Sequence, residues 1–307
     1  MGEPLSRSLR VRGGEVVSVE RSGVDPRLGD EPMAGPDAGI RGPGQGNDGG
    51  TGADLAAGVP GVEPVAEVGL DERHLVCVED AFIVVDKPAG VAAHASPGWH
   101  GPTVVGGLTA LGLPPAQVGA AEREGIVHRL DVGTSGLMVV ARTSAAYTAL
   151  KDQFRHREVA KAYQALVQGL PDPTRGTIDA PIDRHPRSRD RFAVVAGGRP
   201  SVTHYTVREA YRGVTLLDLE LETGRTHQIR VHLSALRHPC VGDLRYGADP
   251  TLAVRLGLTR QWLHAVRLGF RDPRLAPRPG AAETGWWEFT SRPAADLQVA
   301  LAAVQAD

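Results

Sequence analysis

The sequence predicts an α+β protein in which a mixed, mainly antiparallel sheet is flanked by a few helices. Three observations support this fold class. Several segments after residue 71 are β-branched apolar runs or alternate apolar and polar residues, as strands do. Two segments, 144–154 and 226–236, have the spacing of helices. The chain contains no internal repeat.

The first strands follow each other closely. LVCVED (75–80) and FIVVDKPAG (82–90) are β-branched apolar runs, and the second ends in a Pro-Ala-Gly turn. GLMVVAR (136–142) is a further strand. SAAYTALKDQF (144–154) has helical periodicity, with Ser144 as its expected N-cap.

The later segments alternate apolar and polar residues, as half-buried strands of an antiparallel sheet do. These strands are KAYQALVQG (161–169), SVTHYTVREAY (201–211) and GVTLLDLELET (213–223). THQIRVHLSAL (226–236) then changes to helical periodicity. QWLHAVRLGF (261–270) and GWWEFTS (285–291) return to strand.

The N-terminal residues 1–70 differ in composition from the rest. They are rich in Gly, Pro and acidic residues, and segment 35–52 contains 8 glycines. Such a composition cannot repay its ordering entropy. We therefore expect residues 1–70 to be disordered or poorly ordered apart from a candidate strand near 9–19, and residues 71–307 to form a single functional domain.

The charge is distributed unevenly along the chain. The net charge is -2, but residues 1–80 hold 7 Lys and Arg against 15 Asp and Glu, which leaves 27 against 21 in residues 81–307. The second part therefore carries +6 and suits a polyanion, although many domains reach this charge without binding one. Within it, RHREVAK (155–161) and RHPRSRDR (184–191) are basic clusters and candidate contacts for a polyanion. A solvated surface is the alternative for either cluster.

Several classes of protein are disfavoured. No run of about 18 apolar residues is present, and the N-terminus lacks a signal-peptide pattern, so we expect a cytoplasmic protein without a membrane span. The two cysteines, Cys77 and Cys240, have no CxxC spacing, which disfavours a disulfide framework and structural zinc. His227 and His232 lie five residues apart without a HExxH motif, so a metalloprotease is not supported.

One loop concentrates reactive side chains between two apolar strands, a position that active sites favour. It lies within GIVHRLDVGTSGLMVVAR (125–142) and contains His128, Arg129, Asp131, Thr134 and Ser135. Gly133 and Gly136 are expected to permit tight turns through which backbone amides approach a ligand.

HRLD followed by TSG, with DKPAG upstream and GRTHQIRVH, HPCVGD and LHAVRLGF downstream, resembles the RluA family of RNA pseudouridine synthases. The resemblance covers about residues 75–295 and is greatest to the RluD-like branch. It implies an isomerase that converts uridine to pseudouridine in structured RNA without cofactor or metal. RluD-like enzymes usually begin with a small basic RNA-binding domain, which the acidic N-terminus of this chain does not resemble.

The resemblance implies that Asp131, the last residue of HRLD, is the catalytic residue. The reaction breaks the bond between ribose and a ring nitrogen, turns the uracil and rejoins it through a ring carbon. A carboxylate near the sugar is therefore needed, as nucleophile or as base, and the sequence leaves that choice open. The alternative for an Asp beside an Arg is an ordinary ion pair.

Further site residues follow from the same resemblance. Arg129 is expected to enter the RNA stack when the target nucleotide swings out, with a simple phosphate contact as the alternative. His128 is a weaker candidate for substrate binding, since it can instead support the loop by hydrogen bonding. Tyr163 is expected to lie against the flipped uracil, although an aromatic residue on a strand is more often core.

The GRTHQIRVH block adds two residues. Arg225 is expected to be the basic partner that keeps Asp131 ionised, or else to mark a phosphate site at the helix start. Ile229 is expected near the base edge, and Arg230 is expected to face solvent or RNA.

We expect a monomer that acts on large-subunit (23S) ribosomal RNA. Transfer RNA is the alternative substrate. A catalytically inactive RNA-binding module is the alternative from another class. A zinc-dependent deaminase is disfavoured because Pro239-Cys240 is not followed by xxC, and a glycosidase because only one acid is well placed.

Overall fold

The computed structural model describes residues 19–22, 69–96, 98–119, 123–188, 190–275 and 285–306. Its strands are β1 (Val19–Ser22), β2 (Leu75–Val78), β3 (Phe82–Lys87), β4 (Ser135–Ala141), β5 (Ala160–Gln168), β6 (Arg175–Asp179), β7 (Ile182–Arg184), β8 (Phe192–Val194), β9 (Val202–Tyr211), β10 (Val214–Leu221), β11 (Leu263–Arg271) and β12 (Trp286–Thr290). Its helices are α1 (Val104–Ala110), α2 (Ser144–Arg155), α3 (Gln228–Ala235), α4 (Pro250–Arg255) and α5 (Ala295–Gln305), with 3-10 turns η1 (Glu72–His74) and η3 (Leu244–Tyr246).

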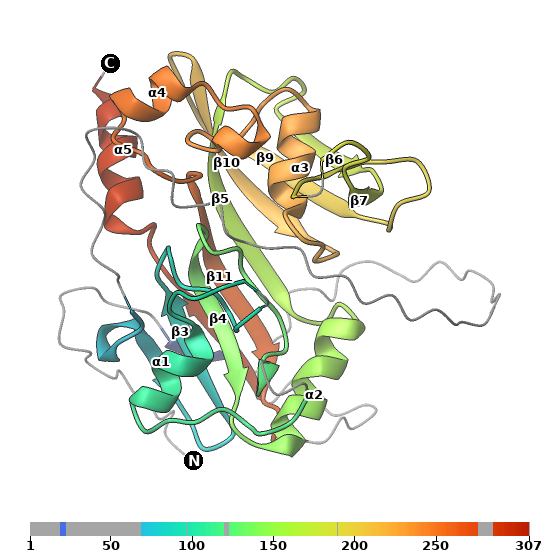
Figure 1. Ribbon diagram of the computed structural model, residues 1–307, viewed down its shortest axis with the longest axis vertical. Helices are drawn as coiled ribbons and strands as arrows, with labels where there is room; N and C mark the ends of the chain where they lie inside the picture. Colours follow the sequence, from blue (N-terminus) through green and yellow to red (C-terminus); the bar gives the residue numbers. More distant parts are fainter. Residues whose placement is uncertain are drawn as a thin grey trace.

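Within the described residues, ten strands form one sheet in the order β2-β3-β4-β11-β5-β10-β9-β6, with β12 beside β11 and β1 beside β12. Only the β4–β11 pairing is parallel among the strand pairs of this part of the chain. The sheet is therefore mixed and mainly antiparallel, with helices packed against it (Figure 1). This confirms the predicted fold class.

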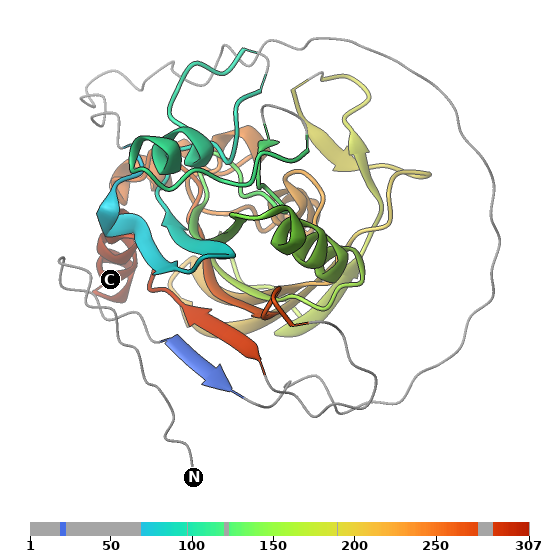
Figure 2. The ribbon, with the colours of Figure 1, turned by 90° about the horizontal axis from the view of Figure 1, so that it is seen from below.

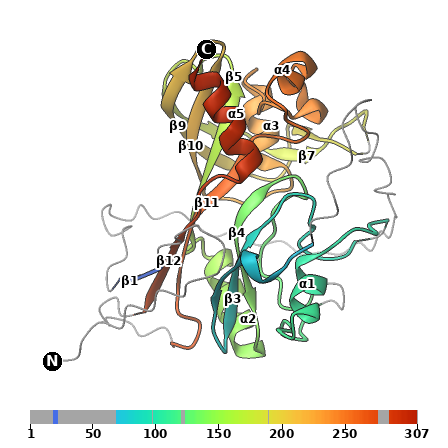
Figure 3. The same cartoon turned by 90° about the vertical axis from the view of Figure 1, so that its left-hand side faces the viewer.

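The sheet is covered on both faces because its central strands alternate between two sets of apolar neighbours. In β4, Met138 and Val140 belong to the core that contains Leu108 of α1, whereas Leu137 and Val139 belong to the core that contains Leu150 of α2. Helix α3 contributes to the same core as α1, and these two helices lie on one side of the sheet (Figure 3). This side carries the candidate site.

Every strand and both helices expected after residue 71 are present within a few residues of their predicted limits. One cap differs. Thr143, not Ser144, caps α2: its backbone is extended and its Oγ1 accepts a hydrogen bond from the amide of Ala146 at 3.1 Å. Ser144 is the first helical residue.

Some elements were not predicted from the sequence. Helix α1 contains two glycines, Gly106 and Gly107, which weaken its helical signal. Strands β6, β7 and β8 have five, three and three residues, too few to give a clear alternation in the sequence. None of the helices in the described ranges is long and apolar enough to cross a bilayer.

The expected disorder of residues 1–70 concerns positions that lie outside the described residues, apart from 19–22 and 69–70. The candidate strand near 9–19 lies outside them too, except for Val19, where β1 begins. Strand β1 pairs with β12 in antiparallel register, Val19 opposite Phe289 (Figure 2). The predicted domain boundary at residue 70 stays a prediction.

Candidate active site

A cleft with a volume of about 590 Å³ lies between the loop before β4 and the segment that leads into α3. All six site residues expected from the sequence line it, namely His128, Arg129, Asp131, Tyr163, Arg225 and Ile229. Folding thus brings together residues that are up to about a hundred positions apart in the chain.

The loop that carries Asp131 is fastened to the DKPAG turn. The ammonium of Lys87, which is fully buried, donates hydrogen bonds to the carbonyls of Pro88 at 2.9 Å, Val91 at 2.8 Å and Val132 at 3.3 Å. The amide of Gly90 also donates to the Val132 carbonyl, at 2.9 Å. The backbone immediately after Asp131 is therefore held from the side of β3.

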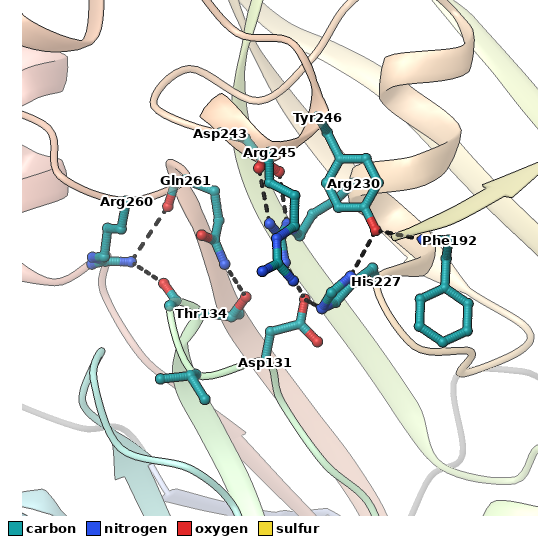
Figure 4. Close-up of polar contacts among 12 residues, drawn as sticks. Asp131, Thr134, Phe192, His227, Arg230, Asp243, Arg245, Tyr246, Arg260 and Gln261 are labelled. Carbon is teal, nitrogen blue, oxygen red and sulfur yellow. Dashed lines mark hydrogen bonds and ion pairs between the residues drawn. The ribbon is translucent and has the colours of Figure 1, made fainter. Parts of the chain in front are cut away.

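Residues before β11 hold the same loop from the other side (Figure 4). Arg260 donates to the carbonyl of Gly133 at 3.0 Å and to the hydroxyl of Ser135 at 3.2 Å. Gln261 donates to the hydroxyl of Thr134 at 3.1 Å. Thr134 and Ser135 are therefore engaged within the protein.

The two loop glycines lie close to other parts of the protein. A Cβ atom at Gly133 would lie 2.6 Å from Oε1 of Gln261. At Gly136, where φ is +116°, it would lie 2.4 Å from the carbonyl oxygen of Ala265 on β11. The glycines thus allow the loop and the parallel strand to pack closely.

Arg230, rather than Arg225, is the basic partner of Asp131. Its Nη1 atom donates to Oδ2 of Asp131 at 3.1 Å. Its Nε and Nη2 atoms donate to the two carboxylate oxygens of Asp243 at 2.7 and 2.8 Å (Figure 4). Arg225 lines the cleft, but its Nε donates to the carbonyl of Pro200 at 3.2 Å. The predicted pairing of Arg225 with Asp131 is therefore wrong.

Asp131 favours its ionised form. Burial raises the pKa of Asp131, but the interaction with His227, the charges of Arg230 and Arg129, and the hydrogen bond from Arg230 outweigh burial and leave the pKa below its ordinary value. The side chain remains 16% exposed and lines the cleft. A charged carboxylate is thus accessible to a bound molecule.

His128 has a structural environment. Its Nε2 accepts the amide hydrogen of Val139 on β4 at 3.0 Å, and its ring stacks on Phe154 with 4.5 Å between centroids. Burial, with the nearby charge of Lys161, lowers the pKa of His128 to about 3. The ring is therefore neutral near pH 7, as the alternative of a loop support requires.

The remaining expected residues form the rim and wall of the cleft. Arg129 is exposed at its edge and makes no hydrogen bond or ion pair with any residue that the structure describes. Tyr163 on β5 and Ile229 on α3 are buried, 8% and 5% exposed, and both line the cleft. Lys161 lines it too, with its ammonium 5.7 Å from the ring centre of Phe154.

Three residues close to Asp131 were not predicted as site residues. His227 was weighed only as a metal ligand, yet its Nε2 lies 3.9 Å from Oδ2 of Asp131. The guanidinium carbon of Arg230 lies over the ring of Tyr246, 4.8 Å from the ring centre. Asp243 accepts a hydrogen bond from the same guanidinium. The signal for Asp243 was its place in the HPCVGD block. Tyr246 had no such signal.

In the part of the chain that the structure describes, no three His, Cys, Asp or Glu side chains are grouped so as to hold a metal ion.

The chain is similar to known proteins over most of the described region. A family model described as RNA pseudouridylate synthase matches residues 81–235. A protein of Mycobacterium bovis named as an uncharacterized RNA pseudouridine synthase is 56% identical over 234 residues, 76% of this chain and 73% of that protein. The ribosomal large subunit pseudouridine synthase D of Xanthomonas campestris is 48% identical over 204 residues, 64% of this chain and 60% of that protein.

Solved structures agree on the fold. Human RNA Pseudouridylate Synthase Domain Containing 1 matches with a TM-score of 0.55 and 29% identity, covering 80% of this chain and 98% of that one. Human RNA Pseudouridylate Synthase Domain Containing 4 matches with a TM-score of 0.57 and 24% identity, covering 76% of this chain and 93% of that one.

Proposed function

Because this chain belongs to the RNA pseudouridine synthases, a family of isomerases, we propose that it isomerises uridines of large-subunit ribosomal RNA with Asp131 as the catalytic residue. The observation that supports the role of Asp131 is its place in the cleft. It is an ionised carboxylate, held by Arg230 and accessible from a cavity lined by further cations.

The cleft suits a nucleotide that has left its stack. A uridine inside an RNA helix cannot reach a carboxylate at the bottom of a cavity, so the base has to swing out at a cost of a few kcal/mol. The exposed Arg129 at the rim is placed to offset this cost by filling the gap or holding the backbone. Tyr163 and Ile229 offer an apolar wall to the uracil.

Asp131 then acts on the sugar. As nucleophile it attacks the ribose, and as base it removes a ribose proton; both routes need the carboxylate unprotonated, which the low pKa of Asp131 provides. After the bond to the ring nitrogen breaks, the uracil turns inside the cleft and rejoins through carbon 5, whose hydrogen is released. The exchange of one glycosidic bond for another needs no net redox change.

The choice of ribosomal RNA rests on relatives. Proteins named ribosomal large subunit pseudouridine synthase D, from Xanthomonas campestris and Nitrosomonas europaea, are 48% and 47% identical to this chain over 204 and 200 residues. The second match covers 57% of that relative.

Tritium release from RNA that contains 5-tritiated uridine tests the chemistry directly. Asp131→Asn keeps the size of the side chain but not its charge, so we expect the rate to fall at least about a thousandfold. Arg267→Gln is a matched control, because Arg267 pairs with Glu288 away from the cleft and should keep near wild-type activity. Activity of Asp131→Asn close to that of wild type would refute the proposed mechanism.

Gene deletion followed by mapping of pseudouridines names the substrate. Sites lost from large-subunit ribosomal RNA, and restored by the wild-type gene but not by Asp131→Asn, are the expected result. Loss confined to transfer RNA would overturn the substrate class while leaving the chemistry intact. If neither deletion nor overexpression of the gene changes the map of pseudouridines, an inactive RNA-binding module would be favoured.

A further inference from the structure

Asp131 is held through only one of its two carboxylate oxygens. Oδ2 lies 3.1 Å from Nη1 of Arg230 and 3.9 Å from Nε2 of His227. Within the described part of the chain, no hydrogen bond reaches Oδ1. The two oxygens are therefore unequal before any substrate arrives.

The ring of His227 is fixed at its other nitrogen by Tyr246. Nδ1 of His227 lies 2.7 Å from the hydroxyl of Tyr246, and that hydroxyl accepts the amide hydrogen of Phe192 at 3.2 Å (Figure 4). Phe192 also packs its ring against that of His227, edge to face, with 5.7 Å between centroids. These contacts link the first residue of β8 to the catalytic carboxylate.

The contacts determine which nitrogen of His227 carries the proton. A phenol has one hydrogen and one good acceptor direction in the plane of its ring. Phe192 occupies the acceptor direction with its N–H, so the hydroxyl hydrogen of Tyr246 points to Nδ1 of His227. Nδ1 is then the acceptor, and the hydrogen of the neutral ring is on Nε2, which faces Asp131.

The backbone at His227 supports a positioned role. Its φ is 56°, the left-handed region that residues other than glycine rarely adopt, and it makes no side-chain cap for α3. Burial lowers the pKa of His227 against the opposing charge of Asp131, with Arg230 and Arg245 acting in the same direction as burial, so the ring is neutral near pH 7.5. A neutral ring donates without taking the charge of Asp131.

We propose that His227 is a positioning residue for the catalytic aspartate. Tyr246 locks it as the Nε2–H tautomer, and it acts with Arg230 on Oδ2 so that Oδ1 of Asp131 is the oxygen that meets the ribose. This inference rests on the proposed role of Asp131. At 3.9 Å the contact is electrostatic rather than a hydrogen bond, and such contacts commonly tighten in the substrate complex.

Nitrogen NMR of protein labelled with ¹⁵N-histidine tests the lock, because protonated and unprotonated ring nitrogens have different shifts. The signals of His227 are assigned by their absence from His227→Gln. In wild type at pH 7.5 we expect Nε2 protonated. Tyr246→Phe should give a mixture of tautomers, whereas Tyr205→Phe should not, since Tyr205 is a buried tyrosine that binds the carbonyl of Pro173 instead.

Kinetics test the role with two amides. Gln places its amide nitrogen where Nε2 of histidine lies, and Asn places it where Nδ1 lies. We expect His227→Gln to keep kcat within about threefold of wild type and His227→Asn to lose about tenfold or more, with KM for RNA changed less than about twofold in both. Backbone strain alone predicts the opposite order, because Asn tolerates the left-handed region better than Gln.

A wild-type ring protonated at Nδ1, a Tyr246→Phe ring that stays wholly in the Nε2–H form, or equal losses in the two amide variants would each overturn the proposal. These results are distinct from failure of the proposed function. In that case Asp131→Asn itself would retain tritium release, whatever the tautomer of His227.

Discussion

Arg230 holds Asp131 without cancelling its charge. Two of its nitrogens are engaged by Asp243, at 2.7 and 2.8 Å, and only Nη1 reaches Asp131. Because Asp243 already balances the guanidinium, the group of three side chains keeps one net negative charge. An isolated Arg–Asp pair would be neutral and a poorer base or nucleophile. The second aspartate therefore leaves Asp131 both fixed and negatively charged.

Lys161 gives the cleft a cation that titrates in an accessible range. Burial, with the charge of Arg157, lowers the pKa of Lys161 to about 8, and no acid among the described residues opposes this. Its charged form is present below that pH and lost above it. We expect RNA affinity to fall as the pH rises from 7 to 9, by about the tenfold that one lost phosphate contact gives. Fluorescence anisotropy with a labelled RNA fragment measures this affinity at each pH.

Lys161→Arg provides the matched comparison for this pH dependence. Arginine stays charged throughout the same range, so the variant should bind RNA with nearly constant affinity between pH 7 and 9. An equally steep decline in wild type and variant would place the titrating group elsewhere.

At the scale of residues, the sequence predicted the membership of the cleft better than its pairings. All six expected residues line it, because their motifs mark the loop before β4, strand β5 and the start of α3. The choice between Arg225 and Arg230 could not be made from spacing. The choice depends on Asp243, which lies in a segment after α3 and binds two nitrogens of Arg230.

At the scale of elements, the parallel pairing of β4 with β11 sets the position of the loop that carries Asp131. Ser135 and Gly136 lie opposite His264 and Ala265, directly after the loop. A Cβ at Gly136 would meet the backbone oxygen and nitrogen of Ala265 at 2.4 and 2.5 Å, which are too rigid to yield.

We therefore expect Gly136→Ala to lower the free energy of unfolding by at least about 2 kcal/mol more than Gly112→Ala. Gly112 also has a positive φ, 73°, but open space around its Cβ position, so it reports the backbone cost alone. Guanidinium unfolding of both variants measures the difference. Equal losses would mean that β4 and β11 separate readily at this point.

The elements that the sequence predicted are those with a periodic pattern and a buried face. Strands β3 and β4 could be predicted from their apolar runs because both of their faces are buried. The pairing of β4 with β11 could not be predicted, because β11 follows more than a hundred residues later and an alternating pattern does not indicate which strand lies beside it. Helix α5, at the other end of the chain, is apolar and lacked a cap signal at Ala294.

At the scale of the whole molecule, basic side chains surround an acidic centre. The hairpin of β7 and β8 carries exposed Arg187 and Arg191 in its turn, and β8 begins at Phe192, whose amide donates to the hydroxyl of Tyr246. We expect Arg187→Gln with Arg191→Gln to weaken RNA binding and to reduce the slope of log affinity against log salt by about 1.4 to 1.8.

The control for this double variant replaces Arg212 and Arg237, two exposed arginines in other turns, with glutamine. It removes the same net charge, so it separates a local contact from the general field of the molecule. Salt titrations that give both double variants the same slope would assign the effect to net charge and remove the hairpin from the RNA contact.

The positions in the chain of the residues that hold Asp131 determine when, during synthesis, this site can be completed. Arg230 follows Asp131 by 99 residues, and the bonds from Arg260 to Gly133 and from Gln261 to Thr134 each span 127. At translation rates of about 5 to 20 residues per second, a growing chain exposes its aspartate for roughly 5 to 25 seconds before the last of these partners is made. An incomplete polypeptide still attached to a ribosome therefore carries Asp131 without the side chains that hold it and its loop.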